Sequence, residues 1–240
     1  MKYIFLSFFL FMISNSYAGV LANKSRIIFE SNNDVQTLLI ANTNKYPIVV
    51  QTWVDHGNGS PLSVVPVFVT PSTFRLEPKQ VQALKIFNFN EQKSPLEQVY
   101  WLNLYEIPPK DIRRDGNNTH RVDLTMNTQH KIFIRSEQLG SFPSSIEKYL
   151  IFKVIVKNEQ ALLQITNKSN FHISFTQLCL STKKNKNCII PIKQEMDMML
   201  KPNITKKYLL ENMPKPSNDI VIYRFVNDSG EIVEKISHLQ

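Results

Sequence analysis

Short apolar runs, rich in β-branched and aromatic residues, alternate with clusters of Asn, Gly, Pro and Ser along most of the chain. Such runs, spaced about 8–12 residues apart, are typical of a β-sandwich or barrel and not of alternating strands and helices. After the first eighteen residues, no stretch of about 12 residues keeps the 3.6-residue periodicity of an amphipathic helix. The pattern therefore predicts an all-β chain.

The predicted strands form two groups, separated by residues 136–145, which contain Gly, Pro and four serines. This composition indicates a domain boundary. We expect two sandwiches of about seven strands each, over residues 19–138 and 147–240, joined by a linker at 139–146. The strands are expected at residues 26–30, 37–40, 48–54, 64–69, 81–89, 100–107 and 122–135, then at 150–157, 161–166, 171–180, 188–192, 208–210 and 220–226.

The first eighteen residues have the features of a cleavable export signal. Lys2 precedes an apolar run over residues 3–13, and Ser16 and Ala18 place small side chains at the two positions that a signal peptidase reads. This run is too short to span a membrane, and no later run approaches the roughly 18–20 apolar residues that a transmembrane helix needs. We expect residues 1–18 to be a signal peptide and the exported chain to begin at Gly19, without a membrane span.

Charge and cysteine content narrow the function further. The net charge is +8, but the basic residues are scattered, and no basic helix or aromatic stacking motif accompanies them, so we expect no nucleic-acid partner. Cys179 and Cys188 are the only cysteines. In an oxidising compartment such a close pair predicts a disulfide, and no second pair at zinc-ligand spacing accompanies it.

No motif of a known catalytic class occurs in the sequence. Serine-hydrolase, zinc-protease and nucleotide-binding signatures are absent, and the five histidines show no metal-ligand spacing. We therefore expect no enzyme activity, no cofactor and no metal site.

Residues 122–135 are the most informative stretch. Val122, Leu124, Met126 and Thr128 alternate with polar residues, so that one face of a strand is apolar and the other polar. Periodicity alone favours an ordinary half-buried strand over a binding strand.

Seven short blocks, in order and at near-family spacing, resemble the periplasmic chaperones of the chaperone–usher pathway. They cover most of the first predicted domain, whereas residues 225–230 carry the looser resemblance of the second. The blocks are residues 24–29, 46–47, 51–54, 69–71, 74–78, 103–109 and 131–135.

This resemblance implies two immunoglobulin-like sandwiches set in an L, with a binding cleft between them. A chaperone of this kind lends a strand to a pilus subunit whose own fold lacks one, by β-augmentation. Here the donor residues would be Val122, Leu124, Met126 and Thr128. The protein would work in the periplasm, bind pilus subunits and deliver them to an outer-membrane usher. The sequence leaves open whether the free protein covers its donor strand by dimerising.

The resemblance also assigns two groups of charges. Arg26 and Lys131 would bind the C-terminal carboxylate of the subunit, for which an arginine fork and a lysine point charge are suited. Lys131 has the opposite strand parity from the donor residues, so we expect a twist or bulge between them. A triad of Glu97, Arg135 and Asp228 would pair across the domain interface and set its angle.

One subclass of the family carries a disulfide between the last two strands of the first domain. The corresponding positions here hold Asn103 and His130, so the chain resembles the short-loop type, with a somewhat extended loop. The competing interpretation is a two-domain immunoglobulin-like surface adhesin or binding module, because sandwiches host many functions. An adhesin would not need two cations to converge beside an exposed apolar edge strand.

Overall fold

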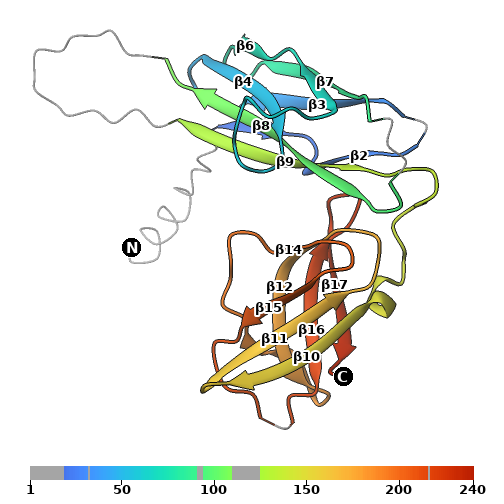
Figure 1. The fold of residues 1–240 in the computed structure, drawn as a ribbon. Coiled ribbons are helices and arrows are strands. Elements are labelled where there is room, and N and C mark those ends of the chain that lie inside the picture. The colour runs from blue at the N-terminus through green and yellow to red at the C-terminus, as the bar shows by residue number, and fades with distance from the viewer. Residues whose placement is uncertain (1–18, 32, 91–93, 110–124, 216) are drawn as a thin grey trace, which may run out of the picture.

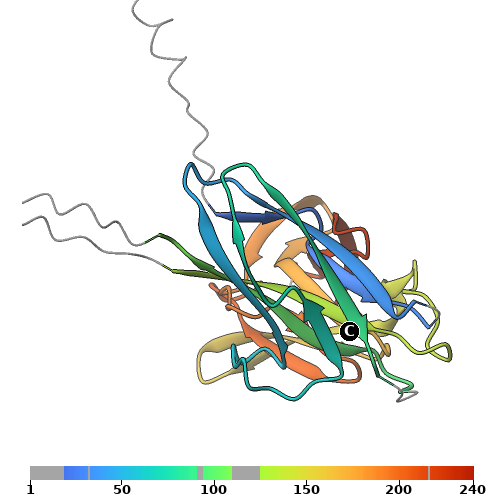
Figure 2. The ribbon, with the colours of Figure 1, turned by 90° about the horizontal axis from the view of Figure 1, so that it is seen from above.

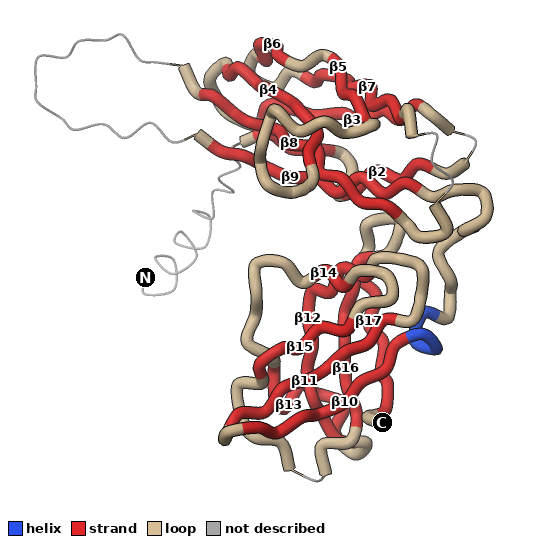
Figure 3. Tube along the Cα trace, in the orientation of Figure 1, coloured by secondary structure: helices blue, strands red, loops and turns tan. Residues whose placement is uncertain are grey.

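A computed structural model describes residues 19–31, 33–90, 94–109, 125–215 and 217–240. The expected signal peptide, Val122, Leu124 and most of the loop after Pro109 lie outside these residues. Within them the chain is almost entirely strand and loop, with a single short 3-10 helix (Figure 3). None of the described helices is long and apolar enough to cross a membrane.

The first half of the chain forms a sandwich of two sheets. One sheet has the order β1 (Val20–Ala22), β3 (Val35–Asn42), β7 (Val81–Asn88) and β5 (Val67–Thr70). The other has the order β2 (Arg26–Phe29), β9 (Met126–Ile134), β8 (Gln98–Ile107), β4 (Ile48–Asp55) and β6 (Thr73–Leu76). All neighbours are antiparallel except β2 and β9, which are parallel.

Alternate residues of these strands fill one core between the two sheets, as the period of two requires. In β4, Ile48, Val50 and Val54 are buried, and in β8 Leu102 and Leu104 occupy the same side. β9 contributes Ile132 and Ile134. The opposite face of the second sheet, which carries the odd-numbered residues of β8 and β9, is thereby left for contacts outside this core.

The second half forms another sandwich after η2 (Ile146–Tyr149). One sheet has the order β10 (Leu150–Lys157), β11 (Gln160–Asn167) and β15 (Thr205–Leu209). The other has the order β13 (Asn185–Pro191), β12 (Ile173–Thr182), β16 (Ile220–Val226) and β17 (Ile232–His238), with β14 (Met199–Leu200) also paired to β12. The predicted disulfide between Cys179 and Cys188 is present and links β12 to β13.

The two sandwiches lie at an angle to one another in an L, joined on one side by the connection from β9 to η2 (Figure 1). Seen from above, the first sandwich lies over the second (Figure 2). The second sheet of the first sandwich, with β2 and β9, faces the second sandwich. The predicted fold class of two all-β sandwiches is confirmed.

The structure has more strands than predicted, and several of the predicted strands are shorter. β1, β6 and β14 have two to four residues, too few to show a period, and β17 is an edge strand with no buried residue. β5 begins at Val67 because Pro66 has no N–H to donate to a ladder. Val64, predicted to begin that strand, is 94% exposed instead.

Candidate functional site

Arg26 and Lys131 lie directly opposite each other on the parallel strands β2 and β9. Paired residues share a sheet face, and here both side chains point to the second sandwich. Arg26 Nη1 donates a hydrogen bond to the carbonyl oxygen of Val226 at 2.9 Å, and Lys131 Nζ lies 3.4 Å from Ser174 Oγ. The two predicted anchor cations are thus brought together where the sandwiches meet.

The surroundings of Arg26 suit an anion. Arg26 lines a hollow of about 200 Å³. Both sandwiches contribute to this hollow, the second through Asp228 and Ser229. Nε of Arg26 is buried and finds no acceptor among the described residues. Burial lowers the pKa of Arg26, although the negative charges of Asp228 and Glu97 partly offset this. An unpaired buried donor is costly, so the free chain keeps an unsatisfied guanidinium nitrogen beside this hollow.

Lys131 has a weak counter-ion in the second sandwich. Its Nζ lies 3.8 Å from Oδ1 of Asp197, in the loop between β13 and β14. The Asp197 side chain is 61% exposed, so solvent screens this pair. Burial lowers the pKa of Lys131, Asp197 raises it, and the nearby positive charge of Arg26 lowers it. A second carboxylate beside Lys131 would therefore stabilise its charged form.

We expected a twist or a bulge between Lys131 and the donor residues, and between the described donors, Met126 and Thr128, and Lys131 there is no bulge. β8 and β9 keep one continuous register from the pair Glu106–Met126 to the pair Gln98–Ile134. The even-numbered residues of β9 lie on the core side and the odd-numbered residues on the side of the second sandwich. The predicted donor residues and Lys131 need no common face, because the donor residues continue the core face of β9 while Lys131 faces the cleft.

The first half of β9 has an open edge. On the side away from β8, β9 pairs with β2 only from Lys131 to Ile134. Met126 and Thr128 belong to the open part, and Met126 is 54% exposed. Val122 and Leu124, the other two predicted donor residues, lie outside the described residues.

An amide network on the odd-numbered face joins β9 to its neighbours. Asn127 and Gln129 each donate a side-chain hydrogen bond of 2.9 Å to Oδ1 of the buried Asn103. Nδ2 of Asn103 donates in turn to Oδ2 of the buried Asp55 at 2.9 Å. No sequence pattern predicted this network, because single polar residues on a half-exposed strand face are common.

The register of β8 with β9 also bears on the expected correspondence of Asn103 with His130. Asn103 pairs across the strands with Gln129, whereas His130 pairs with Leu102. Asn103 and His130 are therefore offset by one residue and lie on opposite faces of the sheet. The position opposite Asn103 is Gln129, and an amide hydrogen bond joins the two.

The three charges of the predicted triad form one connected group. Arg135 Nε donates to Oε1 of Glu97 at 2.8 Å, and its two terminal nitrogens donate to the two oxygens of Asp228 at 2.6 and 2.8 Å. Arg135 and Glu97 are buried, and Asp228 comes from the turn after β16 in the second sandwich. Burial lowers the pKa of Arg135, but its hydrogen bonds to Asp228 and the two negative charges outweigh this and raise it.

A fourth residue, His172, completes this group and was missed from the sequence. Its backbone N–H donates to Oε2 of Glu97 at 2.7 Å, and its Nδ1 lies 3.0 Å from the same oxygen. The Arg135 guanidinium also lies 5.2 Å from the ring centre of Phe171. Every group in the cluster except Glu97 and Arg135 comes from the second sandwich, so the cluster joins the two sandwiches by hydrogen bonds.

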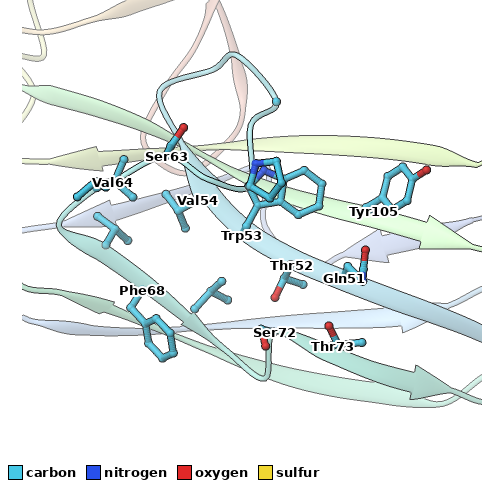
Figure 4. Close-up of a pocket in the computed structure, with 15 residues that line it drawn as sticks. Gln51, Thr52, Trp53, Val54, Ser63, Val64, Phe68, Ser72, Thr73 and Tyr105 are labelled. Carbon is cyan, nitrogen blue, oxygen red and sulfur yellow. The ribbon is translucent and has the colours of Figure 1, made fainter.

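A separate hollow of about 770 Å³ lies on the first sandwich between β4, β5 and the connection that joins them (Figure 4). Trp53 and Tyr105 stand on one side of it, while Val64 and Phe68 stand on the other. No charged side chain lines it. None of the predicted site residues contributes to it. Within the described chain, no three His, Cys, Asp or Glu side chains are placed to hold a metal ion.

Comparisons with known proteins bear on both halves of the chain. Residues 19–140 match the family described as "Pili and flagellar-assembly chaperone, PapD N-terminal domain". Residues 146–237 match the family described as "Pili assembly chaperone PapD, C-terminal domain". Together the two matches cover most of the chain.

Individual relatives are consistent with these matches. The chain is 27% identical to the probable fimbrial chaperone YadV of Escherichia coli over 92% of its length and 90% of that protein. It is 29% identical to the chaperone protein FimB/FhaD of Bordetella pertussis over 67% of each. The SafB chaperone of Salmonella enterica, solved in complex with the SafA pilin, shares the fold with a TM-score of 0.73 at 23% identity, over 94% of this chain and 99% of that one. The chain belongs to the PapD family of pili-assembly chaperones.

Proposed function

We propose that the chain binds pilus subunits in the cleft between its sandwiches and holds them until they are assembled. The observation that carries this is the pairing of Arg26 with Lys131 beside the open half of β9. The cations would bind the C-terminal carboxylate of the subunit, which places its last strand along β9. A surface adhesin, the other interpretation that the sequence allows, has no use for a partly unsatisfied arginine at the base of such an edge.

β9 would complete the subunit by β-augmentation. Its free N–H and C=O groups would pair with the open edge of the subunit, and Val122, Leu124 and Met126 would fill the apolar groove. Each side chain, once well buried, contributes about 1.5–3 kcal/mol. The Asn103 network holds the odd-numbered face of β9 in register, and the Arg135 cluster sets the angle of the cleft.

The cellular setting follows from the same proposal. Residues 1–18 would direct export to the periplasm and be removed there, and the loaded chaperone would deliver its subunit to an outer-membrane usher. A free chaperone with an exposed Met126 on an open edge is open to self-association, since such edges pair readily. Any pairing of two free chains along this edge would have to be undone before a subunit binds.

Removing both anchor cations tests the proposal. The double variant Arg26→Ala, Lys131→Ala should fold and yet capture a co-expressed pilus subunit at least about tenfold less well, since each charge-assisted contact is worth about 1.5–3 kcal/mol. Burial lowers the pKa of both cations, so desolvation of their charges offsets part of the hydrogen bonds that they form in the free fold. The melting temperature should therefore change little. Periplasmic co-purification measures capture.

A matched control is the double variant Lys153→Ala, Lys157→Ala, which removes the same charge from exposed positions of β10. It should capture subunits normally. Equal capture by the two double variants would contradict the carboxylate site.

Asp197 occupies the position beside Lys131 that a subunit carboxylate would take, so the two should compete. Replacing Asp197 with Asn should tighten binding of a peptide that carries a free C-terminal carboxylate by up to about fivefold, because an exposed pair is worth about 0.2–1 kcal/mol. Calorimetric titration measures this. Glu195→Gln removes a charge from the same loop that pairs with Lys206 instead, and should change the affinity less. Weaker binding by Asp197→Asn would show that Asp197 assists the ligand.

A further inference from the structure

Gly19 is held at both its backbone groups. The residue is buried at one end of the first sandwich, immediately before β1. Its N–H donates to Oδ1 of Asn44 at 3.0 Å, and its carbonyl oxygen accepts from the N–H and the Oγ1 of Thr43 at 3.0 and 2.7 Å. Three short hydrogen bonds to one glycine at the start of the fold indicate that the fold holds its backbone in a specific position.

A buried carboxylate completes this position. Glu106 of β8 is buried, and its Oε1 accepts from Nδ2 of Asn44 at 2.7 Å. Its Oε2 accepts from the N–H of Val20 at 3.0 Å. The same oxygen would lie 3.6 Å from a Cβ added to Gly19, so it is directly beside that residue. Asn44 thus bridges the Gly19 nitrogen and the Glu106 carboxylate.

Glu106 has only neutral donors in this arrangement. Among the described residues its hydrogen-bond partners are a backbone N–H and a side-chain amide, and no Lys, Arg or His forms an ion pair with it. A buried carboxylate without a cation is costly, whereas a paired one is tolerated. The buried Arg135 and Glu97 of the same sandwich follow that rule, and Glu106 does not.

We propose that Asn44 and Glu106 form a receptor for the α-ammonium group of Gly19, which arises when the chain is cleaved between Ala18 and Gly19. Hydrolysis by a signal peptidase adds one water across that peptide bond. The hydroxyl joins the carbonyl carbon of Ala18, the nitrogen of Gly19 takes the hydrogen, and the acid proton moves to the amine. The product is a carboxylate on the leaving peptide and an ammonium on Gly19 with three donors, one for Asn44 and others for Glu106.

The position of this receptor links processing to the cleft. Glu106 is the cross-strand partner of Met126, the first residue of β9. Cleavage therefore stabilises the end of the sandwich from which the predicted donor strand extends. The inference concerns the folded state of the processed chain and stands whether or not the protein binds pilus subunits.

The test compares one protein before and after it acquires the ammonium group. Residues 1–18 are replaced by the recognition sequence of a protease that cuts immediately before glycine, and thermal melts are recorded before and after cutting at pH 6.5. Cutting should raise the melting temperature by at least about 2–4 °C. The carboxylate raises the pKa of the amine above its unfolded value of about 7.7–8.0. The gain should therefore be complete below that value and disappear as the pH rises through the folded value.

The Glu106→Gln variant should lose this rise in melting temperature on cutting. The control Glu77→Gln, which changes an exposed carboxylate of the same sandwich, should keep it. An equal gain in Glu106→Gln, or no gain in the unaltered protein, would overturn the proposal. A second measurement needs no variant. Acylation of the Gly19 amine in the folded, cut protein, followed by mass spectrometry at pH 7, should be at least tenfold slower than in urea, and equal rates would also overturn it.

Discussion

Met126→Lys is expected to leave the melting temperature of the free chain nearly unchanged and to abolish subunit capture. Met126 is 54% exposed on the open edge of β9, so the free protein loses little packing. Lysine is preferred to aspartate here because the cross-strand partner is Glu106, and two carboxylates directly opposite each other destabilise a ladder. In a complex, the ammonium group would lose its water in a groove lined by apolar side chains, which is costly. Melts of the monomer and subunit pull-downs measure the two effects.

Val156→Lys is the matched control, because Val156 is 55% exposed on β10 of the second sandwich. The two variants carry the same change at similar exposure, but only one lies on the proposed donor strand. A drop of many degrees in Met126→Lys would mean that this residue belongs to a core strand. Normal capture by Met126→Lys would remove β9 from the proposed interface. From the sequence we expect Leu124→Asp to behave as Met126→Lys does.

The parts of the site that could be predicted from the sequence are those that local pattern or family blocks encode. Residues 131–135 stand in one block, so the close placement of Lys131 and Arg135 followed from it, although β9 ends at Ile134, one residue before Arg135. The alternation of residues 122–128 predicted a strand with one apolar face, and its described part is β9. The pairing of Arg26 with Lys131 required the parallel contact of β2 and β9, which only the resemblance implied.

The parts that could not be predicted depend on contacts between distant residues with no pattern of their own. Asn103 is one of many asparagines, and only the register of β8 with β9 places Gln129 against it. His172 joins Glu97 across 75 residues of sequence. The twist or bulge expected before Lys131 came from the assumption that all functional side chains share one face. The strand uses both of its faces, one for the predicted groove contacts and one for the cleft.

Arg135→Met is expected to cause the largest loss of stability of any single change proposed for this chain. The variant keeps much of the side-chain volume but leaves Glu97 buried, with only His172 beside it, and deprives Asp228 of two hydrogen bonds. Removing one partner of a buried ion pair costs about 3–5 kcal/mol. For a chain of this size the melting temperature should fall by roughly 6–20 °C. Calorimetry of the free protein measures this fall.

Arg75→Met is the control that isolates the effect of burial on the loss of stability. Arg75 and Glu77 form an ion pair with an N–O distance of 2.7 Å, close to the 2.8 Å between Arg135 and Glu97, but both side chains are more than half exposed. An exposed pair contributes at most about 1 kcal/mol, so its loss should shift the melting temperature by only a few degrees. Because Asp228 belongs to the second sandwich, Arg135→Met should also loosen the angle between the sandwiches. Asp228→Asn should therefore weaken subunit capture while leaving the first sandwich folded. Normal capture by that variant would show that the Arg135 cluster does not affect subunit binding in the cleft.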